Sequence, residues 1–225
     1  MLTHPTLDLP PLVEPADLDG DLPAAVRTWD EPLRAILGWA LRYLCRPHPE
    51  LGRKGDVCPF TEGALARHTF YMAVCGGLPV SADEVAGTVA HYRDWFLDLP
   101  PTSGSAAQFK TILILFPELT GPDLHPVIDE AQRVLKQSYV SHGLMVGEFH
   151  DGPPDKAGLW NSSFRPLRSP VPLLAIRHMV PTDFPFLSLD DDHVTAYLRL
   201  FGDRVPTHLR PQVAAATARL GKAVP

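Results

Sequence analysis

Residues 112–116 read Ile-Leu-Ile-Leu-Phe, an apolar run without a single polar residue. The run is too short for a helix of its own, and it lacks the alternation of a half-exposed strand. It is typical of a central strand that is buried on both faces. The chain is therefore expected to build a β-sheet with helices packed against it.

The flanking segments complete this sheet and supply its helices. Apolar residues recur at helical spacing or gather in short strand-like runs. The expected helices are 30–45, 81–99, 127–139, 190–201 and 207–220, and the further strands are 68–74, 144–149 and 171–176. The order is a helix, then β-α-β-α-β-β, then helices. It predicts the α+β class, with a small mixed sheet, an N-terminal helix and C-terminal helices packed on it.

The chain is expected to form one domain. Its 225 residues are 45% hydrophobic, which is enough for one proper core. Prolines interrupt every period in residues 1–23, which predicts an irregular arm. Residues 24–225 are then a single α+β domain. The two C-terminal helices leave open whether they cap the sheet or form the interface of a homodimer.

Composition excludes several classes of function. A net charge of −6 with scattered Lys and Arg gives no basic stripe for nucleic acid. No apolar run approaches the ~20 residues that span a bilayer, and the first residues lack a signal-peptide pattern. We therefore expect a cytoplasmic protein without a membrane partner. Three cysteines without a C-x-x-C pair predict free thiols, and the common nucleotide-binding and serine-hydrolase motifs are absent.

Polar residues that the fold does not need gather between residues 143 and 179. Side chains at i and i+2 of a strand share a face, so Glu148 and His150 are expected to point the same way. On the last strand His178 points to one side and Arg177 to the other. If these two strands are neighbours, His150 and His178 could converge.

Two arginines and a cysteine extend this set. The forked guanidinium groups of Arg165 and Arg168 suit a carboxylate or a phosphate. A further short helix is expected between residue 60 and the strand that begins at 68, and Cys58 precedes Pro59 at its start, where a thiolate is favoured. Each of these residues also has an ordinary structural interpretation, as a surface ion pair, a packed histidine or a small buried hydrophobe. The sequence leaves both interpretations open.

Three motifs occur in a fixed order, Asp-Val-Cys-Pro-Phe at 56–60, Leu-Met-Val-Gly-Glu-Phe-His at 144–150 and Ser-Pro-Val-Pro-Leu-Leu-Ala-Ile-Arg-His at 169–178. With them the chain resembles an actinobacterial family of uncharacterised proteins and, more remotely, the YqcI/YcgG family. Some members of the latter are haem-dependent oxygenases that hydroxylate a nitrogen of amino acids or guanidines. The resemblance covers about residues 57–187, and the family's His-Pro corresponds to His150-Asp151 in this chain.

The resemblance implies haem b as the cofactor and specialised, natural-product metabolism as the setting. It makes His150 the axial ligand of the iron, with the Cys58 thiolate as the alternative. Arg165 or Arg168 would bind a haem propionate or the substrate carboxylate, and Phe60 would line the cofactor. His178 and Glu148 would shape hydrogen bonding on the reactive side. The substrate would carry an amine or guanidine, and an electron donor or a peroxide would supply the redox equivalents.

Two other functions remain open from the residues alone. Glu148, His150 and His178 have the composition of a two-histidine, one-carboxylate site for non-haem iron. A protein that binds haem or another small molecule without turning it over fits the scarcity of strong catalytic motifs.

Overall fold

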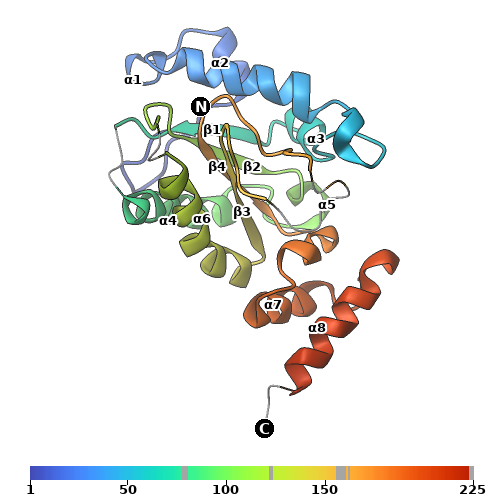
Figure 1. Cartoon of the computed structure of the whole chain (residues 1–225). Helices are drawn as coiled ribbons and strands as arrows, with labels where there is room; N and C mark the ends of the chain where they lie inside the picture. Colours follow the sequence, from blue (N-terminus) through green and yellow to red (C-terminus); the bar gives the residue numbers. More distant parts are fainter. Residues whose placement is uncertain (78–80, 122–123, 156–160, 162, 223–225) are drawn as a thin grey trace.

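The centre of the molecule is a four-stranded mixed sheet (Figure 1). The computed structural model describes residues 1–77, 81–121, 124–155, 161 and 163–222. The strands lie in the order β1-β2-β4-β3, with β1 and β2 parallel and β4 antiparallel to both neighbours. The α+β class and the order β-α-β-α-β-β are confirmed. The strands are β1 Phe70–Val74, β2 Thr111–Leu115, β3 Leu144–Phe149 and β4 Leu173–His178.

Helices cover both faces of this sheet. On one face α4 (Ala82–Asp98) and α6 (Leu124–Ser141) bury the side chains that include Ile112. On the other face α2 (Asp30–Trp39) packs over side chains that include Leu113. Figure 1 shows α2 above the sheet and α4 and α6 below it. The apolar run at 112–116 is therefore buried from both sides, as its lack of alternation predicts.

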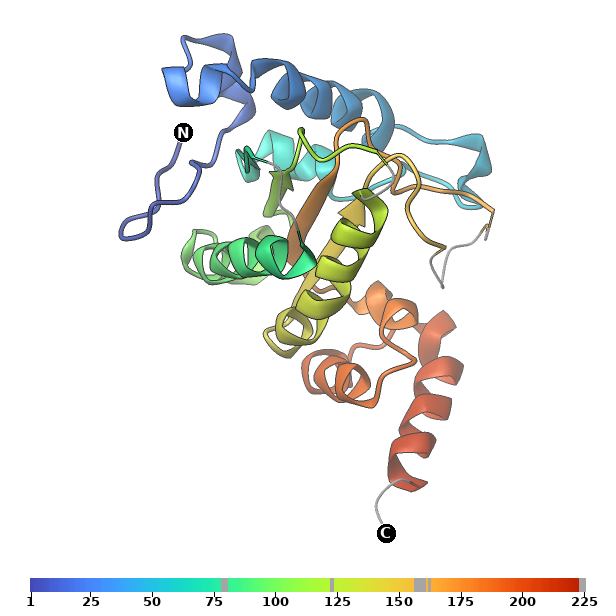
Figure 2. The ribbon, with the colours of Figure 1, turned by 60° about the vertical axis from the view of Figure 1, so that its left-hand side comes forward.

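The C-terminal helices pack on one another beside one end of the sheet (Figure 2). The connection η4 (Pro181–Phe186) leads from β4 to α7 (Asp191–Phe201) and then to α8 (Arg210–Lys222). Their shared core holds Tyr197, which is fully buried, and it reaches the sheet through Met145 of β3. This cluster is a third apolar core, next to the two on the faces of the sheet, and it covers part of β3 that α6 does not cover.

The N-terminal segment packs along the sheet before its first helices, η1 (Pro15–Asp19) and α1 (Ala24–Arg27). The backbone N–H of Val13 donates to Met72 O of β1 at 2.7 Å, and the N–H of Met72 donates back to Val13 O at 2.9 Å. The neighbouring Leu12 is fully buried. Residues 1–23 are irregular in much of their course, and they contribute to the core.

The helix expected over 30–45 changes form partway. α2 is an α-helix to Trp39, and residues 40–44 continue it as a π-helical turn, η2 (Ala40–Leu44). Such turns are frequent at functional sites. Among the described residues, no helix has both the length and the apolar character to cross a bilayer. The remaining short elements are η3 Pro49–Leu51, α3 Thr61–Ala66, α5 Gly104–Ala107 and η5 Thr207–Leu209.

Candidate functional site

The residues expected to converge lie at opposite ends of the sheet. β3 and β4 are neighbours, but they are antiparallel, so His178 faces Leu144 and Glu148 faces Leu174. Four residues of strand separate Glu148 from the level of His178, which is about 13 Å at ~3.3 Å per residue. His150 lies farther still. The expected convergence of His150 with His178 is therefore wrong, because the two strands run in opposite directions.

His150 is enclosed at the end of β3, and its side chain is 0% exposed. Its Nδ1 accepts a hydrogen bond from the N–H of Gly152 at 3.1 Å. The proton must then sit on Nε2, which donates to Asp129 Oδ1 of α6 at 2.9 Å. Glu148, 1% exposed, is buried on the same face as α6. Both nitrogens of His150 thus form hydrogen bonds within the protein, and the bond to Asp129 links the end of β3 to α6.

His178 lies at the other end of this face, against the ring of Phe96 at 4.9 Å. Burial lowers the pKa of His178 to about 4, and the charge of nearby Lys110 adds to the shift. Lys110 is fully buried, and its Nζ donates to the carbonyl oxygens of Phe96, at 2.6 Å, and Leu99. Burial lowers the pKa of Lys110 to about 8. Lys110 thereby caps the C-terminal end of α4, which is a structural role.

Arg177 points to the opposite face from His178, as the strand period predicts. It forms two hydrogen bonds with the Asp183 carboxylate, each 2.7 Å long. Burial opposes the charge of Arg177, but Asp183 and the nearby Cys58 outweigh it and raise the pKa of the guanidinium. Cys58 is half-buried at the edge of the core beneath α2. Phe60 lies apart, with its ring 6.1 Å from that of Phe109.

Five aromatic rings form a continuous row on the α2 side of the sheet. They come from the end of β3, from α2 and η2, from the loop before η3 and from the segment before β4. Consecutive ring centroids are 5.8, 6.0, 6.0 and 4.7 Å apart. We call this row the aromatic ladder, and in order it consists of Phe149, Trp39, Tyr43, His48 and Phe164. All but Phe164 are partly exposed.

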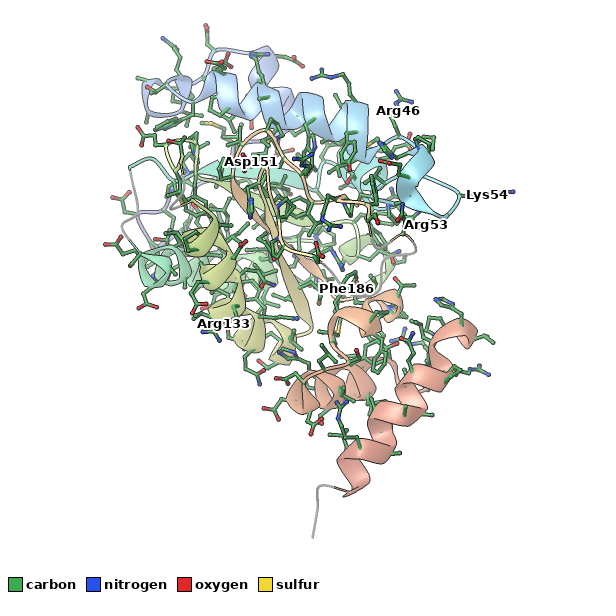
Figure 3. The ribbon with its side chains drawn as sticks, viewed as in Figure 1. Arg46, Arg53, Lys54, Arg133, Asp151 and Phe186 are labelled. Atoms are coloured by element: carbon green, nitrogen blue, oxygen red, sulfur yellow. The ribbon has the colours of Figure 1, made fainter. Side chains whose placement is uncertain are left out.

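Two arginines lie beside this ladder, and further positive side chains lie near the loop of His48. Arg168 lies close enough to Tyr43 to oppose the rise in pKa that burial gives the tyrosine hydroxyl, and its Nε donates to Asp151 O at 2.8 Å. Arg165, next to Phe164, is paired with Asp155. Figure 3 shows Arg46, Arg53 and Lys54 around the loop that carries His48. The two arginines proposed from the sequence therefore lie beside the ladder.

Sequence reasoning missed the aromatic members of this site. Trp39 and Tyr43 are four residues apart, a spacing that places two rings on one side of a helix. His48 follows Pro47 in the loop that leads to Cys58. The spacing of the first pair was a usable signal. The contact of His48 with Phe164 joins residues 116 positions apart, and no local pattern predicts it.

The described residues contain no cluster of three or more His, Cys, Asp or Glu side chains suited to a metal ion. The sequence matches no curated protein and no solved structure. Residues 33–212 match the family model of a domain of unknown function, DUF6875. This match includes every sequence-predicted site residue and all five rings of the aromatic ladder. The chain therefore belongs to the DUF6875 family.

Proposed function

We propose that this chain binds a flat, negatively charged small molecule against the aromatic ladder. One observation carries the proposal: rings from four separate segments form one partly exposed row, and Arg165 and Arg168 lie beside it. Aromatic faces stack on flat ligands, and guanidinium groups pair with carboxylates or phosphates. The ladder would hold the plane of the ligand, and the arginines would hold its charged groups.

Haem belongs to this ligand class, and a haem-dependent oxygenase that hydroxylates an amine or guanidine nitrogen is the second candidate. His150 does not fit the axial position, because Asp129 and Gly152 engage both of its nitrogens. Cys58 does fit, since its thiol is half-buried beside the same core as Trp39 and Tyr43. A thiolate is an established haem ligand.

In this second candidate each residue has a limited task. Haem, when bound, would supply the activation of dioxygen or of a peroxide. Cys58 would hold the iron, and Arg168 would bind a propionate or the carboxylate of the substrate. Glu148 is buried on the opposite face of the sheet from the ladder, so it would have a structural role and would not contact the ligand. The non-haem iron site is not proposed, because Glu148 and His178 are too far apart to share an ion.

Titration with haemin and with metal-free protoporphyrin IX separates the two candidates. Both probes are flat dicarboxylates, but only haemin offers iron to a protein ligand. We expect both to quench tryptophan fluorescence, and the quenching should shrink in Trp39→Phe. Arg168→Ala should weaken both probes about 10-fold, the loss of one charge-assisted contact of ~1.4 kcal/mol. Cys58→Ser should weaken haemin alone and shift its Soret band.

Arg219→Ala is the matched control, because this exposed arginine on α8 pairs with Asp191 away from the ladder. It should leave both affinities unchanged. Equal loss in Arg168→Ala and Arg219→Ala would mean that the probes bind non-specifically. If Cys58→Ser changes neither the affinity for haemin nor its spectrum, the haem candidate fails and the binding function remains.

A further inference from the structure

Cys45 and Cys58 are separated in the sequence by a loop. Backbone hydrogen bonds between the two ends of this loop bring them side by side. Leu44 O accepts a hydrogen bond from the N–H of Cys58 at 2.9 Å, and Arg46 O accepts one from Val57 at 2.9 Å. The next pair along, Pro47 and Asp56, continues this antiparallel contact. Cys45 lies between Leu44 and Arg46, so it lies opposite Cys58.

The hydrogen bonds limit the distance between these two cysteines. Standard backbone dimensions place Cys45 Cα within roughly 3 Å of Leu44 O and Cys58 Cα within about 1.5 Å of its own nitrogen. Adding the 2.9 Å hydrogen bond gives a Cα–Cα separation of at most about 7.4 Å. Disulfides need about 4.4–6.8 Å. Even at the upper limit, backbone movement of about 0.6 Å would bring the pair within this range.

The electrostatic surroundings of the two thiols differ. Burial raises the pKa of Cys45 to about 11, and the neighbouring Cys58 adds to the shift. Cys58 instead lies within electrostatic reach of the Arg177 guanidinium. Positive charge beside a sulfur favours its attack on an oxidant. The raised pKa keeps the Cys45 thiol protonated, which suits Cys45 to the second step, and its place opposite Cys58 lets it resolve the product.

The third cysteine supplies an internal comparison. Cys75 follows β1, and its N–H donates to Leu115 O. Burial raises the pKa of Cys75 to about 12, which keeps its thiol protonated. It packs against the core on the face of α4 and α6, whereas Cys58 packs against the core beneath α2. Cys75 is thus excluded from the chemistry of the other two.

We propose that Cys45 and Cys58 are a redox-active thiol pair that closes to a disulfide when the protein meets a peroxide. The Cys58 sulfur attacks one oxygen of hydrogen peroxide, the O–O bond breaks, and a sulfenic acid and one water form. The Cys45 sulfur then displaces the hydroxyl group, and the S–S bond forms as a second water leaves. The two thiols lose two electrons and two protons, which the peroxide takes up.

The test counts thiols in the full chain before and after treatment with a small excess of hydrogen peroxide. The denatured reduced protein should give three thiols, its full cysteine count, and the oxidised protein should give one. Trypsin cuts after Arg42, Arg53, Lys54 and Arg67, so Cys45 and Cys58 fall in separate peptides. The oxidised digest should contain these two peptides joined, two hydrogens lighter than their sum, and a reductant should separate them.

Single substitutions identify the pair. Cys75→Ser should still yield the joined peptide, and its thiol count should fall from two to zero. Cys45→Ser should stop at a sulfenic acid on Cys58, which dimedone traps, and Cys58→Ser should keep both remaining thiols. The proposal is overturned if the oxidised protein keeps three thiols. It is also overturned if wild-type Cys58 accumulates as sulfenic acid without a joined peptide, or if Cys75 occurs in the joined peptide.

Discussion

The side chain of His150 links the end of β3 to α6 through a hydrogen bond. Its Nε2–H is fully buried and donates to Asp129, which is itself partly exposed. We predict that Asp129→Ala lowers the free energy of unfolding by about 1–3 kcal/mol, because a buried donor loses its acceptor. Urea denaturation measures this change. Glu130→Ala, which removes an exposed ion pair with Arg133 on the same helix, should cause no measurable change. Equal urea midpoints for the two variants would contradict a stabilising role of the His150–Asp129 hydrogen bond.

His178 should make the fold sensitive to acid. Its pKa is about 4 in the folded chain and near 6.5 in the unfolded chain. Between these values the unfolded state binds more protons, so stability falls as the pH drops from 6.5 to 4. One proton sets an upper limit of about 1.4 kcal/mol per pH unit.

His178→Gln should flatten this part of the stability profile, measured as urea midpoints at intervals of half a pH unit. The exposed His91 supplies the matched control, and His91→Gln should keep the wild-type slope. A slope that survives in His178→Gln would assign the acid sensitivity to other groups.

The period of two along a strand correctly placed His178 and Arg177 on opposite faces. The same period could not place His150 relative to His178. That relation depends on the direction of β4, which pairs antiparallel with both β2 and β3. Local pattern therefore predicts the face of a residue, whereas distance between strands is a property of the topology.

At the scale of the helices, substitution of glycine by alanine is expected to have opposite effects on stability at two positions. A Cβ on Gly63 of α3 would lie 2.4 Å from a ring atom of Phe109, whereas a Cβ on Gly87 of α4 would meet nothing within 4 Å. Gly87→Ala should stabilise the protein by roughly 0.5–1 kcal/mol, because alanine favours a helix. Gly63→Ala should destabilise it by about 1–3 kcal/mol through overpacking. Thermal or urea unfolding of both variants checks this, and a stabilising Gly63→Ala would contradict the contact.

The long elements were predictable because their periods are regular. The strand 144–149 agrees with β3 to the residue, and the helices over 81–99 and 127–139 correspond to α4 and α6. The π-helical form of η2 was not predictable, since an apolar period cannot distinguish an α-turn from a π-turn over five residues. This turn positions Tyr43 in the aromatic ladder, so the candidate site could be predicted only in part.

At the scale of the whole molecule, the sheet depends on its last strand. β4 lies between β2 and β3, so without it β3 has no partner in the sheet. We predict that a chain ending at residue 170 shows no cooperative urea transition by circular dichroism. A chain ending at residue 189 keeps all four strands and loses only the cover of α7 and α8. It should unfold cooperatively at a lower urea midpoint. A cooperative transition in the shorter chain would contradict the central role of β4.

The position of β4 also bears on how the protein is made. On the ribosome, β1, β2 and β3 emerge before residues 173–178, so the nascent chain must hold β3 and one edge of β2 without their strand partner. Open strand edges invite pairing with other chains. Synthesis therefore leaves an interval in which a chaperone or a pause in translation would protect the chain, and that interval ends only when β4 has left the ribosome.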